Sequence, residues 1–488
     1  MTLQSPRSQD IIIIGGTGDL ARRKLLPAFY SLSRNHLLPA TGDIIGLAHG
    51  DYTDEQYREL ARSAVQSFAE TGFEERSWRT FATRLHYRKV GAEAYAELAA
   101  RPAKQRLVYL AVPPASFPEI VAALGAAGLA HGTRVVFEKP FGVGVVSSLA
   151  LDQAVHSVFE EPQVFRIDHY LGKETVQNIL MFRFANSMFE RVWNRDGIDH
   201  IQITAAESIG IEGRGSFYEQ VGALRDVVQN HVLQLLSLLA MEPPYSMAPD
   251  AIRDEKAKVF RAMRPLDPRT VVRGQYVGGV VGGQPVPGYR QEPGVAADSD
   301  VETFFAAKVE IDSWRWAGVP FYLRAGKRMG ARQTEIAIVF RPAPLSFFEG
   351  CSVEAYRPNM LFIRIQPEES IVFRFMAKQP GPEMCLQQVN MNFSYQDSFM
   401  TKPAEAYERL LHDAMDGDQT LFLRSDSVQR AWEVVQPVLD NPSPVSFYAA
   451  GSWGPRESDQ LLAPLHWAQQ RAAGGPPPPP QPERRAAR

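Results

Sequence analysis

Hydrophobic residues in the first third of the chain alternate between short continuous runs and helical spacing. Asp10 opens a run that continues with four isoleucines, and residues 22–33 place Leu25, Phe29 and Leu32 on one side of a helix. Strands that alternate with helices predict parallel βαβ units, and strands that are apolar on both faces predict a sheet covered on both sides. The other expected strands are 44–48, 107–112 and 134–138, and the other expected helices are 55–68 and 118–129.

The pattern changes near residue 172, where strand-like runs follow one another without helices between them. Two of these runs flank Pro367-Glu368-Glu369, which is typical of a hairpin turn. Successive strands without helical crossovers predict a large, mainly antiparallel sheet. The predicted fold class is therefore an α/β Rossmann-type nucleotide domain followed by an α+β domain built on that sheet. The expected runs are 201–205, 301–311, 320–324, 334–340, 359–366 and 370–377.

Length and composition agree with a globular protein of two large units. The 488 residues are 45% hydrophobic and 22% charged, which is ordinary for folded domains. We assign residues 1–172 to a dinucleotide-binding Rossmann-like domain and residues 173–473 to an α+β substrate and oligomerisation domain. Residues 474–488 include five consecutive prolines and are predicted to form a disordered Pro-rich tail.

Charge and cysteine content exclude several functional classes. The 52 Lys and Arg residues nearly balance the 55 Asp and Glu residues, whereas nucleic-acid-binding domains carry a basic excess. The chain has neither the apolar run of about 18 residues that a membrane span needs nor a signal-peptide core. Its two cysteines, Cys351 and Cys385, lack metal-ligand spacing. We therefore expect a cytoplasmic protein that binds no nucleic acid, membrane or metal.

A glycine-rich turn follows the first predicted strand. Residues 16–21 satisfy the pattern G-x-G-x-x-A and lead directly into a helix. Glycines at such a turn let the backbone approach a pyrophosphate, and the helix N-terminus offers N–H groups to that anion. The turn therefore predicts a bound dinucleotide. The candidate cofactor-binding residues are Gly15, Gly16, Thr17, Gly18, Asp19, Leu20, Arg22 and His49.

Three further segments concentrate side chains that can bind an anion or move a proton. EKPFG at 138–142 follows a predicted strand, and its Lys139–Pro140 bond is a candidate for the cis form. RIDHYLGKE at 166–174 places Lys173 near a helix N-terminus, and an apolar helix at 222–236 contains His231. Taken singly, these segments are also compatible with a surface turn, a solvated loop and a core histidine.

If His231 is a general base, another residue must orient its imidazole. Asp226 lies five residues away, about 140° around an α-helix, so a direct pair is not expected. Asp168 is the better candidate, because a neutral histidine held by a carboxylate commonly takes a proton from an alcohol near neutral pH.

Taken together, these segments resemble glucose-6-phosphate dehydrogenase. The resemblance runs in order from about residue 10 to residue 465, and RIDHYLGKE is highly specific for that family. It implies oxidation of D-glucose 6-phosphate at C1 to 6-phospho-D-glucono-1,5-lactone with hydride transfer to NADP or NAD, the first step of the oxidative pentose phosphate pathway. The matching stretches are GGTGDLARRKLL at 15–26, EKPFG at 138–142, RIDHYLGKE at 166–174, DVVQNHVLQ at 226–234 and FYLRAGKR at 321–328.

The resemblance also implies roles for individual residues. His231 resembles the base that removes the C1 hydroxyl proton, and Asp168 resembles the carboxylate that orients it. Lys139 would lie between cofactor and substrate, as part of both binding sites. The family and the large sheet together imply a homodimer or homotetramer. The other implied substrate-binding residues are His169, Tyr170 and Lys173 for the sugar phosphate, Glu207 and Asp226 for sugar hydroxyls, and Lys327 and Arg332.

The chain departs from the family pattern at two positions. NADP-selective members carry an arginine where this chain has His49, so NADP preference is a hypothesis and NAD stays possible. Gln333 stands where animal members carry a lysine for an additional structural NADP, so that extra site is not expected.

Three alternatives stay open at this point. An oxidoreductase of the glucose–fructose oxidoreductase type shares a nucleotide domain and an E-K-P segment, but it lacks RIDHYLGKE. A paralogue of the dehydrogenase would act on another sugar phosphate. A catalytically silent, cofactor-binding regulatory subunit would show an altered base or phosphate site, whereas those positions are intact here.

Overall fold

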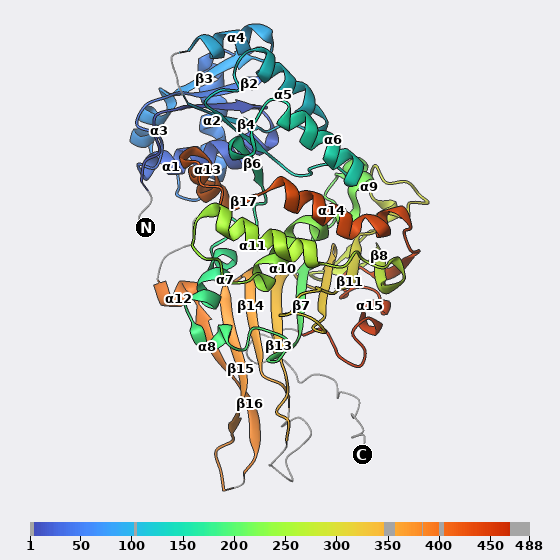
Figure 1. The fold of residues 1–488 in the computed structure, drawn as a ribbon. Coiled ribbons are helices and arrows are strands. Elements are labelled where there is room, and N and C mark those ends of the chain that lie inside the picture. Colours follow the sequence, from blue (N-terminus) through green and yellow to red (C-terminus); the bar gives the residue numbers. More distant parts are fainter. Residues whose placement is uncertain (1–3, 102–104, 346–356, 383, 400–404, 469–488) are drawn as a thin grey trace.

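The computed structural model describes residues 4–101, 105–345, 357–382, 384–399 and 405–468. Within these ranges the strands form a seven-stranded sheet, a nine-stranded sheet and a two-stranded ribbon. The seven-stranded sheet lies at one end of the molecule and the nine-stranded sheet at the other, with helices between them (Figure 1). The predicted tail at 474–488 and Cys351 lie outside the described residues.

The first sheet has the strand order of a Rossmann domain. Six parallel strands follow one another in the order β3-β2-β1-β4-β5-β6, which is the order typical of dinucleotide-binding folds. This confirms the predicted α/β class of the first part, although β3 and β6 were not among the expected strands. The strands are β1 (Asp10–Ile14), β2 (Ile44–Ala48), β3 (Leu85–Lys89), β4 (Arg106–Leu110), β5 (Thr133–Phe137) and β6 (Val164–Ile167).

Helices cover this sheet on both faces and connect its strands (Figure 1). The chain leaves the glycine turn as a short π-helix, η1 (Ala21–Leu25), which continues into α1 (Leu26–Arg34). A capping box between Thr53 and Gln56 fixes the start of the next helix. The remaining helices are α2 (Asp54–Phe68), α3 (Glu75–Ala82), α4 (Ala92–Ala100), α5 (Phe117–Ala126) and α6 (Val145–His156).

The carboxyl ends of four parallel strands are level with one another. Ile14 of β1 pairs with Leu110 of β4, Leu110 pairs with Phe137 of β5, and Phe137 pairs with Arg166 of β6. The segments that follow these strands therefore meet at one edge of the sheet, where α/β folds bind ligands. At about 4.8 Å per strand, the glycine turn and the end of β6 are roughly 14 Å apart.

The second sheet confirms the predicted α+β part. Its strand order is β16-β15-β14-β13-β7-β12-β11-β8-β18, and all neighbours are antiparallel except β7 with β12 and β8 with β18. β14 and β15 flank the predicted hairpin turn at 367–369. The strands are β7 (Ile198–Ala206), β8 (Val271–Val277), β11 (Phe304–Val309), β12 (Phe321–Gly326), β13 (Gln333–Phe340), β14 (Met360–Gln366), β15 (Ser370–Lys378), β16 (Leu386–Ser394) and β18 (Val445–Ala449).

Helices of the second part of the chain lie between the two sheets (Figure 1). The apolar helix predicted at 222–236 consists of two consecutive helices. The π-helix η4 (Leu224–Val232) is followed directly by the α-helix α10 (Leu233–Ala240). Among the helices that the structure describes, none has the length and apolarity that a membrane crossing requires. The other helices used below are α7 (Glu174–Phe184), α9 (Gly215–Ala223), α11 (Pro249–Ala262), α13 (Ala406–Asp416) and α14 (Ser425–Asp440).

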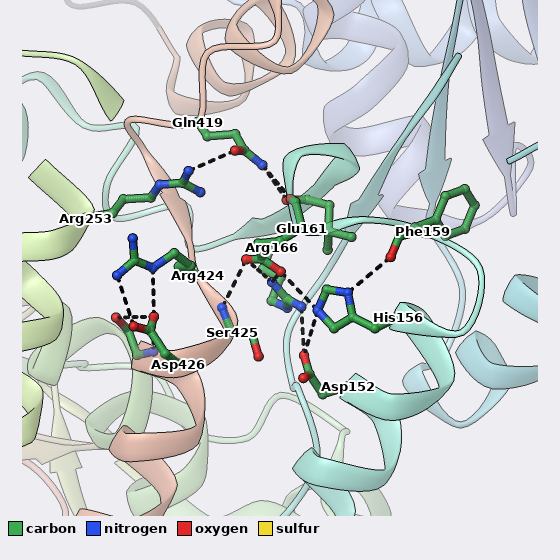
Figure 2. Close-up of polar contacts among 12 residues, drawn as sticks. Asp152, His156, Phe159, Glu161, Arg166, Arg253, Gln419, Arg424, Ser425 and Asp426 are labelled. Atoms are coloured by element: carbon green, nitrogen blue, oxygen red, sulfur yellow. Dashed lines mark hydrogen bonds and ion pairs between the residues drawn. The ribbon is translucent and has the colours of Figure 1, made fainter. Parts of the chain in front are cut away.

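A C-terminal segment returns to complete the first sheet. The short strand β17 (Phe422–Leu423) pairs antiparallel with β6. Beside this pair, the buried Arg166 guanidinium donates to Glu161 at 2.8 Å and to Asp152 at 2.9 Å. The Ser425 amide, which begins α14, donates to the same Glu161 (Figure 2). The domain boundary near residue 172 stays a prediction. The structure shows in addition that β17, far beyond that boundary, belongs to the first sheet.

Candidate active site

The centre of the site is a contact between His231 and Asp168. The carboxylate follows β6 and the imidazole projects from η4, and Nδ1 of His231 lies 2.5 Å from Oδ1 of Asp168. The amide of Tyr170 donates to the same oxygen at 3.0 Å, which fixes the carboxylate from the side of its own loop. Both side chains are buried. The pairing expected from the sequence is therefore the pairing that the fold makes.

Electrostatics set the protonation states of this pair. Burial raises the pKa of Asp168, but the adjacent His231 imidazole outweighs burial and lowers that pKa to about 2. Burial lowers the pKa of His231 below its usual value, although Asp168 opposes this shift. Near neutral pH, Asp168 is therefore ionised and His231 is neutral, with its proton on Nδ1. The lone pair on Nε2 is then available to accept a proton.

Two aromatic neighbours hold the imidazole plane. The Tyr170 ring stacks on His231, with centroids 4.2 Å apart and planes 16° apart. The His169 ring meets the same imidazole edge-on at 4.6 Å. Because Asp168 fixes Nδ1 and Tyr170 fixes the ring plane, the direction of Nε2 is set without a further hydrogen bond. Burial and the neighbouring His231 also lower the pKa of His169, so this second imidazole is neutral as well.

The π-helical conformation of η4 changes how Asp226 and His231 relate. The sequence argument used α-helical spacing, but a π-helix has a wider turn, so residues five apart lie nearer one face. The two side chains interact electrostatically. Asp226 nevertheless bonds elsewhere: its backbone oxygen accepts from Lys139 Nζ at 2.6 Å and its carboxylate at 3.2 Å. The carboxylate that contacts His231 is thus Asp168 and not Asp226, and the orienting role of Asp168 stays a prediction.

Alternating charges extend from this dyad toward the second sheet. Lys139 follows β5, and the bond between it and Pro140 is cis, as the sequence suggested. The other oxygen of Asp226 lies 3.8 Å from Lys327 Nζ, and Lys327 also pairs with Glu207. The two lysines lower the pKa of Asp226 despite its burial. These four residues come from β5, η4 and the ends of β12 and β7, and together they present both donors and acceptors to a polyhydroxylated ligand.

A second cationic group lies on the far side of Tyr170. The Lys173 ammonium donates to Gln366 Oε1 at 2.8 Å and lies 4.6 Å from the Tyr170 ring centroid. Burial, together with the nearby Arg332 guanidinium, which is exposed, lowers the pKa of Lys173 to about 8. Two cations that disfavour each other in this way form a site that an anion stabilises.

The structure adds residues that the sequence did not single out. Gln366 ends β14 and donates from Nε2 to Thr334 at 2.8 Å, and the Tyr170 hydroxyl lies 3.2 Å from the same Thr334 oxygen. Glu138 is buried and accepts hydrogen bonds from the hydroxyls of Tyr109 and Tyr407. The available signal for Gln366 was its place immediately before the predicted hairpin turn.

The glycine turn lies apart from this cluster, along the same sheet edge. Gly15 has φ +89°, and a Cβ there would lie 2.2 Å from the Ala111 carbonyl oxygen. A Cβ on Gly16 would lie 2.7 Å from Gly46 Cα, so the turn packs directly on β2. The turn between β1 and η1 therefore has no side chain at Gly15 and Gly16, directly before the start of a helix, which fits a pyrophosphate. The other expected residues of this turn, Thr17, Gly18, Asp19 and Leu20, lie between β1 and η1.

Arg22 and His49 belong to different elements beside that turn, η1 and the end of β2. Arg22 lines a groove between η1 and α2, together with Arg23 and Asp19. His49 is exposed immediately after β2. The structure brings Arg22 and Asp19 together in this groove, whereas His49 does not line it.

The arrangement has the parts needed to remove a proton and a hydride from one alcohol carbon. It has an oriented neutral base, donors and acceptors for neighbouring hydroxyls, a two-cation anion site and a dinucleotide turn at the same sheet edge.

Comparisons with known proteins agree with this chemistry. Residues 12–178 match the family model of the glucose-6-phosphate dehydrogenase NAD binding domain, and residues 180–468 match that of its C-terminal domain. Glucose-6-phosphate 1-dehydrogenase 2 of Mycobacterium tuberculosis is 45% identical over 476 residues, covering 93% of this chain and 92% of its own. The Rhizobium meliloti glucose-6-phosphate 1-dehydrogenase is 44% identical over 473 residues, covering 93% and 96%.

Two solved structures are similar over nearly the whole chain. Glucose-6-phosphate 1-dehydrogenase from Mycobacterium avium superposes with a TM-score of 0.85 at 40% identity, covering 96% of this chain and 99% of that one. A glucose-6-phosphate dehydrogenase in complex with glucose 6-phosphate superposes with a TM-score of 0.88 at 34% identity, covering 96% and 100%.

Proposed function

The chain belongs to the glucose-6-phosphate dehydrogenase family, and from this membership we propose how its own side chains oxidise D-glucose 6-phosphate at C1 to 6-phospho-D-glucono-1,5-lactone. The observation that carries the proposal is the buried contact between His231 and Asp168. It supplies a neutral base, held in one orientation, at the edge of a Rossmann sheet.

His231 is the base of the reaction. Nε2 takes the proton of the C1 hydroxyl, the O–H electron pair forms the C1=O bond, and the C1–H bond leaves as hydride. A nicotinamide dinucleotide bound at the glycine turn supplies the hydride acceptor. Asp168 keeps the proton on Nδ1 and stabilises the imidazolium that forms, which is the usual role of a carboxylate beside a catalytic histidine.

The remaining candidate residues position the sugar phosphate. Lys173 and Arg332, with His169 and Tyr170, bind the phosphate, because a dianion relieves the repulsion between the two cations. The other charged groups bind the sugar itself. Glu207 and Asp226 accept from sugar hydroxyls, while Lys327 and Lys139 hold those carboxylates in place, with Lys139 between substrate and cofactor.

We further propose that the cofactor is NADP, with NAD as the less preferred partner. The glycine turn supports a dinucleotide, and permanent cations near the end of β2 support a cofactor with an additional phosphate. Specificity constants measured side by side with NADP and NAD test this, and a clear advantage for NAD would contradict it.

The assembly that we propose is a homodimer or homotetramer in the cytoplasm. The outer strands of the large sheet support self-association, since β16 exposes 63% of Met391. Sedimentation of the purified chain distinguishes a monomer from either oligomer. We also propose that residues 1–172 form the nucleotide-binding domain and that residues 173–473 form the substrate and oligomerisation domain.

The alternatives to this function are not favoured. A paralogue acting on another sugar phosphate would be expected to depart from the family at the sugar-binding residues, and a regulatory subunit would be expected to lose the base. Here His231, Asp168 and Lys173 all have the contacts that the reaction requires.

His231→Asn tests the base directly. Asparagine has no basic nitrogen, so we expect kcat to fall about 10²- to 10⁴-fold, while the dissociation constant for glucose 6-phosphate changes little. Turnover is measured by the absorbance of the reduced nicotinamide, and substrate binding by calorimetry. His131→Asn is the matched control, since His131 is exposed in the turn before β5, at the opposite end of that strand from Lys139. A His231→Asn enzyme with near-normal kcat would contradict the assignment.

A further inference from the structure

The end of β2 leaves the recognition of an additional phosphate unassigned. His49, the first residue after β2, is exposed, and no arginine or lysine follows it before Tyr52. The neighbouring strand β3 ends level with β2, because Ala48 pairs with Lys89. Figure 1 shows β2 and β3 side by side at the outer part of the first sheet. Side chains from the end of β3 can therefore serve the site at the end of β2.

A groove lies over these two strand ends. It is lined by the loop after β2, which includes Asp51, Tyr52 and Thr53, and by the end of β3, which includes Tyr87, Arg88 and Lys89. The groove neighbours the glycine turn, because the amide of Gly16 donates to Leu47 of β2 at 3.0 Å. In Rossmann folds this position, at the carboxyl end of the second strand, receives the adenine ribose.

The loop that forms one wall of this groove is held in a fixed shape. The Tyr87 hydroxyl donates to the carbonyl oxygens of Ala48 and Gly50. The Tyr52 ring packs edge-on against Tyr87, with centroids 5.3 Å apart. The loop between Ala48 and Thr53 is thereby tied to β3, and Asp51 is presented across the groove to Lys89.

The two permanent cations of the groove differ in how they are engaged. Arg88 donates from Nε to both oxygens of Glu97 at 2.9 Å and from Nη1 to the Tyr87 carbonyl at 2.7 Å. Lys89 has an ion pair with Asp51 at 2.9 Å, and these side chains are 59% and 84% exposed. An exposed pair of this kind contributes little to stability, so an anion can displace Asp51 from Lys89 at small cost.

We propose that Lys89 binds the 2′-phosphate of NADP and that Asp51 competes with that phosphate, so that this pair sets the cofactor preference. The proposal rests on the proposed function, and it names the residues that choose between the two cofactors. With NADP, the Lys89 ammonium exchanges the Asp51 carboxylate for the phosphate. With NAD, Asp51 accepts from the ribose hydroxyls, as acidic residues near this strand end do in NAD-dependent folds.

Kinetics of three variants of the full chain test the proposal, with glucose 6-phosphate saturating. The measured quantity is kcat/KM for NADP divided by kcat/KM for NAD. We expect Lys89→Met to lower this ratio about tenfold, as befits a charge-assisted contact, and Asp51→Asn to raise it several-fold. Lys258→Met is the matched control, because Lys258 is also an exposed lysine paired with a carboxylate, at 2.7 Å from Glu255 on α11. Its ratio should equal that of the original chain.

Binding without turnover provides the second readout. Calorimetry with adenosine 2′,5′-bisphosphate and with adenosine 5′-monophosphate isolates the contribution of the 2′-phosphate. Lys89→Met should weaken the bisphosphate about tenfold and leave the monophosphate unchanged. A preference that survives Lys89→Met in both measurements would overturn the proposal, and so would an effect confined to Asp51→Asn. A chain that reduces neither cofactor with glucose 6-phosphate would instead contradict the proposed function, and the calorimetric arm would still test Lys89.

Discussion

The two cations Lys173 and Arg332 show how single residues tune this site. The two charges lie close enough to repel each other before any ligand is present, and Lys173 contacts the Tyr170 ring that stacks on His231. The repulsion between them is relieved only by an anion. This arrangement makes binding of a phosphate sensitive to the protonation of Lys173, whose pKa is lowered to about 8.

Activity at alkaline pH follows from this lowered pKa. Below pH 8 the Lys173 ammonium is charged, and above it the charge is lost, so kcat/KM for glucose 6-phosphate should fall as pH rises through about 8. Bound phosphate favours the charged form, so kcat should fall at higher pH than kcat/KM does. Lys173→Arg is the comparison, since arginine keeps its charge. If both enzymes lose kcat/KM over the same pH range, another group is responsible.

At the level of single residues, the sequence predicted the contact between Asp168 and His231 but not the contact of Gln366 with Lys173. Asp168 and His231 could be paired because each belongs to a motif whose chemistry requires the other. Gln366 could not be found in this way, because it contacts Lys173 only after β14 is placed beside the loop that follows β6. Its role depends on a contact between segments 193 residues apart, and no local pattern records such a contact.

At the scale of strands and helices, the sequence again predicted some elements and missed others. The strongly apolar strands β1, β2 and β5 were predicted, since buried strands of a parallel sheet read as continuous apolar runs. β3 was not, because it lies at the sheet edge and alternates buried Leu85 and Tyr87 with charged side chains. The π-helical form of η4 was also beyond prediction, since hydrophobic spacing alone does not separate a π-helix from an α-helix.

The glycine turn between β1 and η1 allows a prediction about an element. Gly15→Ala forces a Cβ into the left-handed region, which costs about 1–2 kcal/mol, and places that Cβ 2.2 Å from the Ala111 carbonyl oxygen. We expect a loss of at least that free energy of unfolding in urea, together with weaker cofactor binding. Gly91→Ala is the control, because no atom lies within 4 Å of its added Cβ. Equal stability of the two variants would show that β1 and β4 can separate at no cost.

For the whole molecule, the cluster around Arg166 joins segments that are distant in the chain. Its guanidinium bonds Asp152 of α6 and Glu161, and the latter accepts from Ser425 at the start of α14. Gln419 bonds the carbonyl of Glu161 and also Arg253 of α11 (Figure 2). The nucleotide-binding sheet is thus fastened to the second part of the chain beside the strand that leads to Asp168.

Removing the central charge of this cluster should weaken the whole fold. Arg166→Met leaves two half-buried carboxylates without their cation, and breaking such a buried pair typically costs about 3–5 kcal/mol. Arg261→Met is the control, because the Arg261 side chain is 67% exposed and pairs with Asp426 at 3.2 Å, so that about 0–1 kcal/mol is expected. Denaturant unfolding of both variants measures the difference. Similar losses in the two would mean that Arg166 contributes no more than a surface pair.

The return of β17 to β6 has a consequence for synthesis on the ribosome. The first six strands of the nucleotide-binding sheet emerge within the first 167 residues, but their last partner, β17, is translated some 255 positions later. Until then, the edge of β6 that leads to Asp168 has unpaired backbone groups open to other strands. A nascent chain therefore assembles its dinucleotide turn early, whereas the catalytic carboxylate receives its final support only when almost the entire polypeptide has been made.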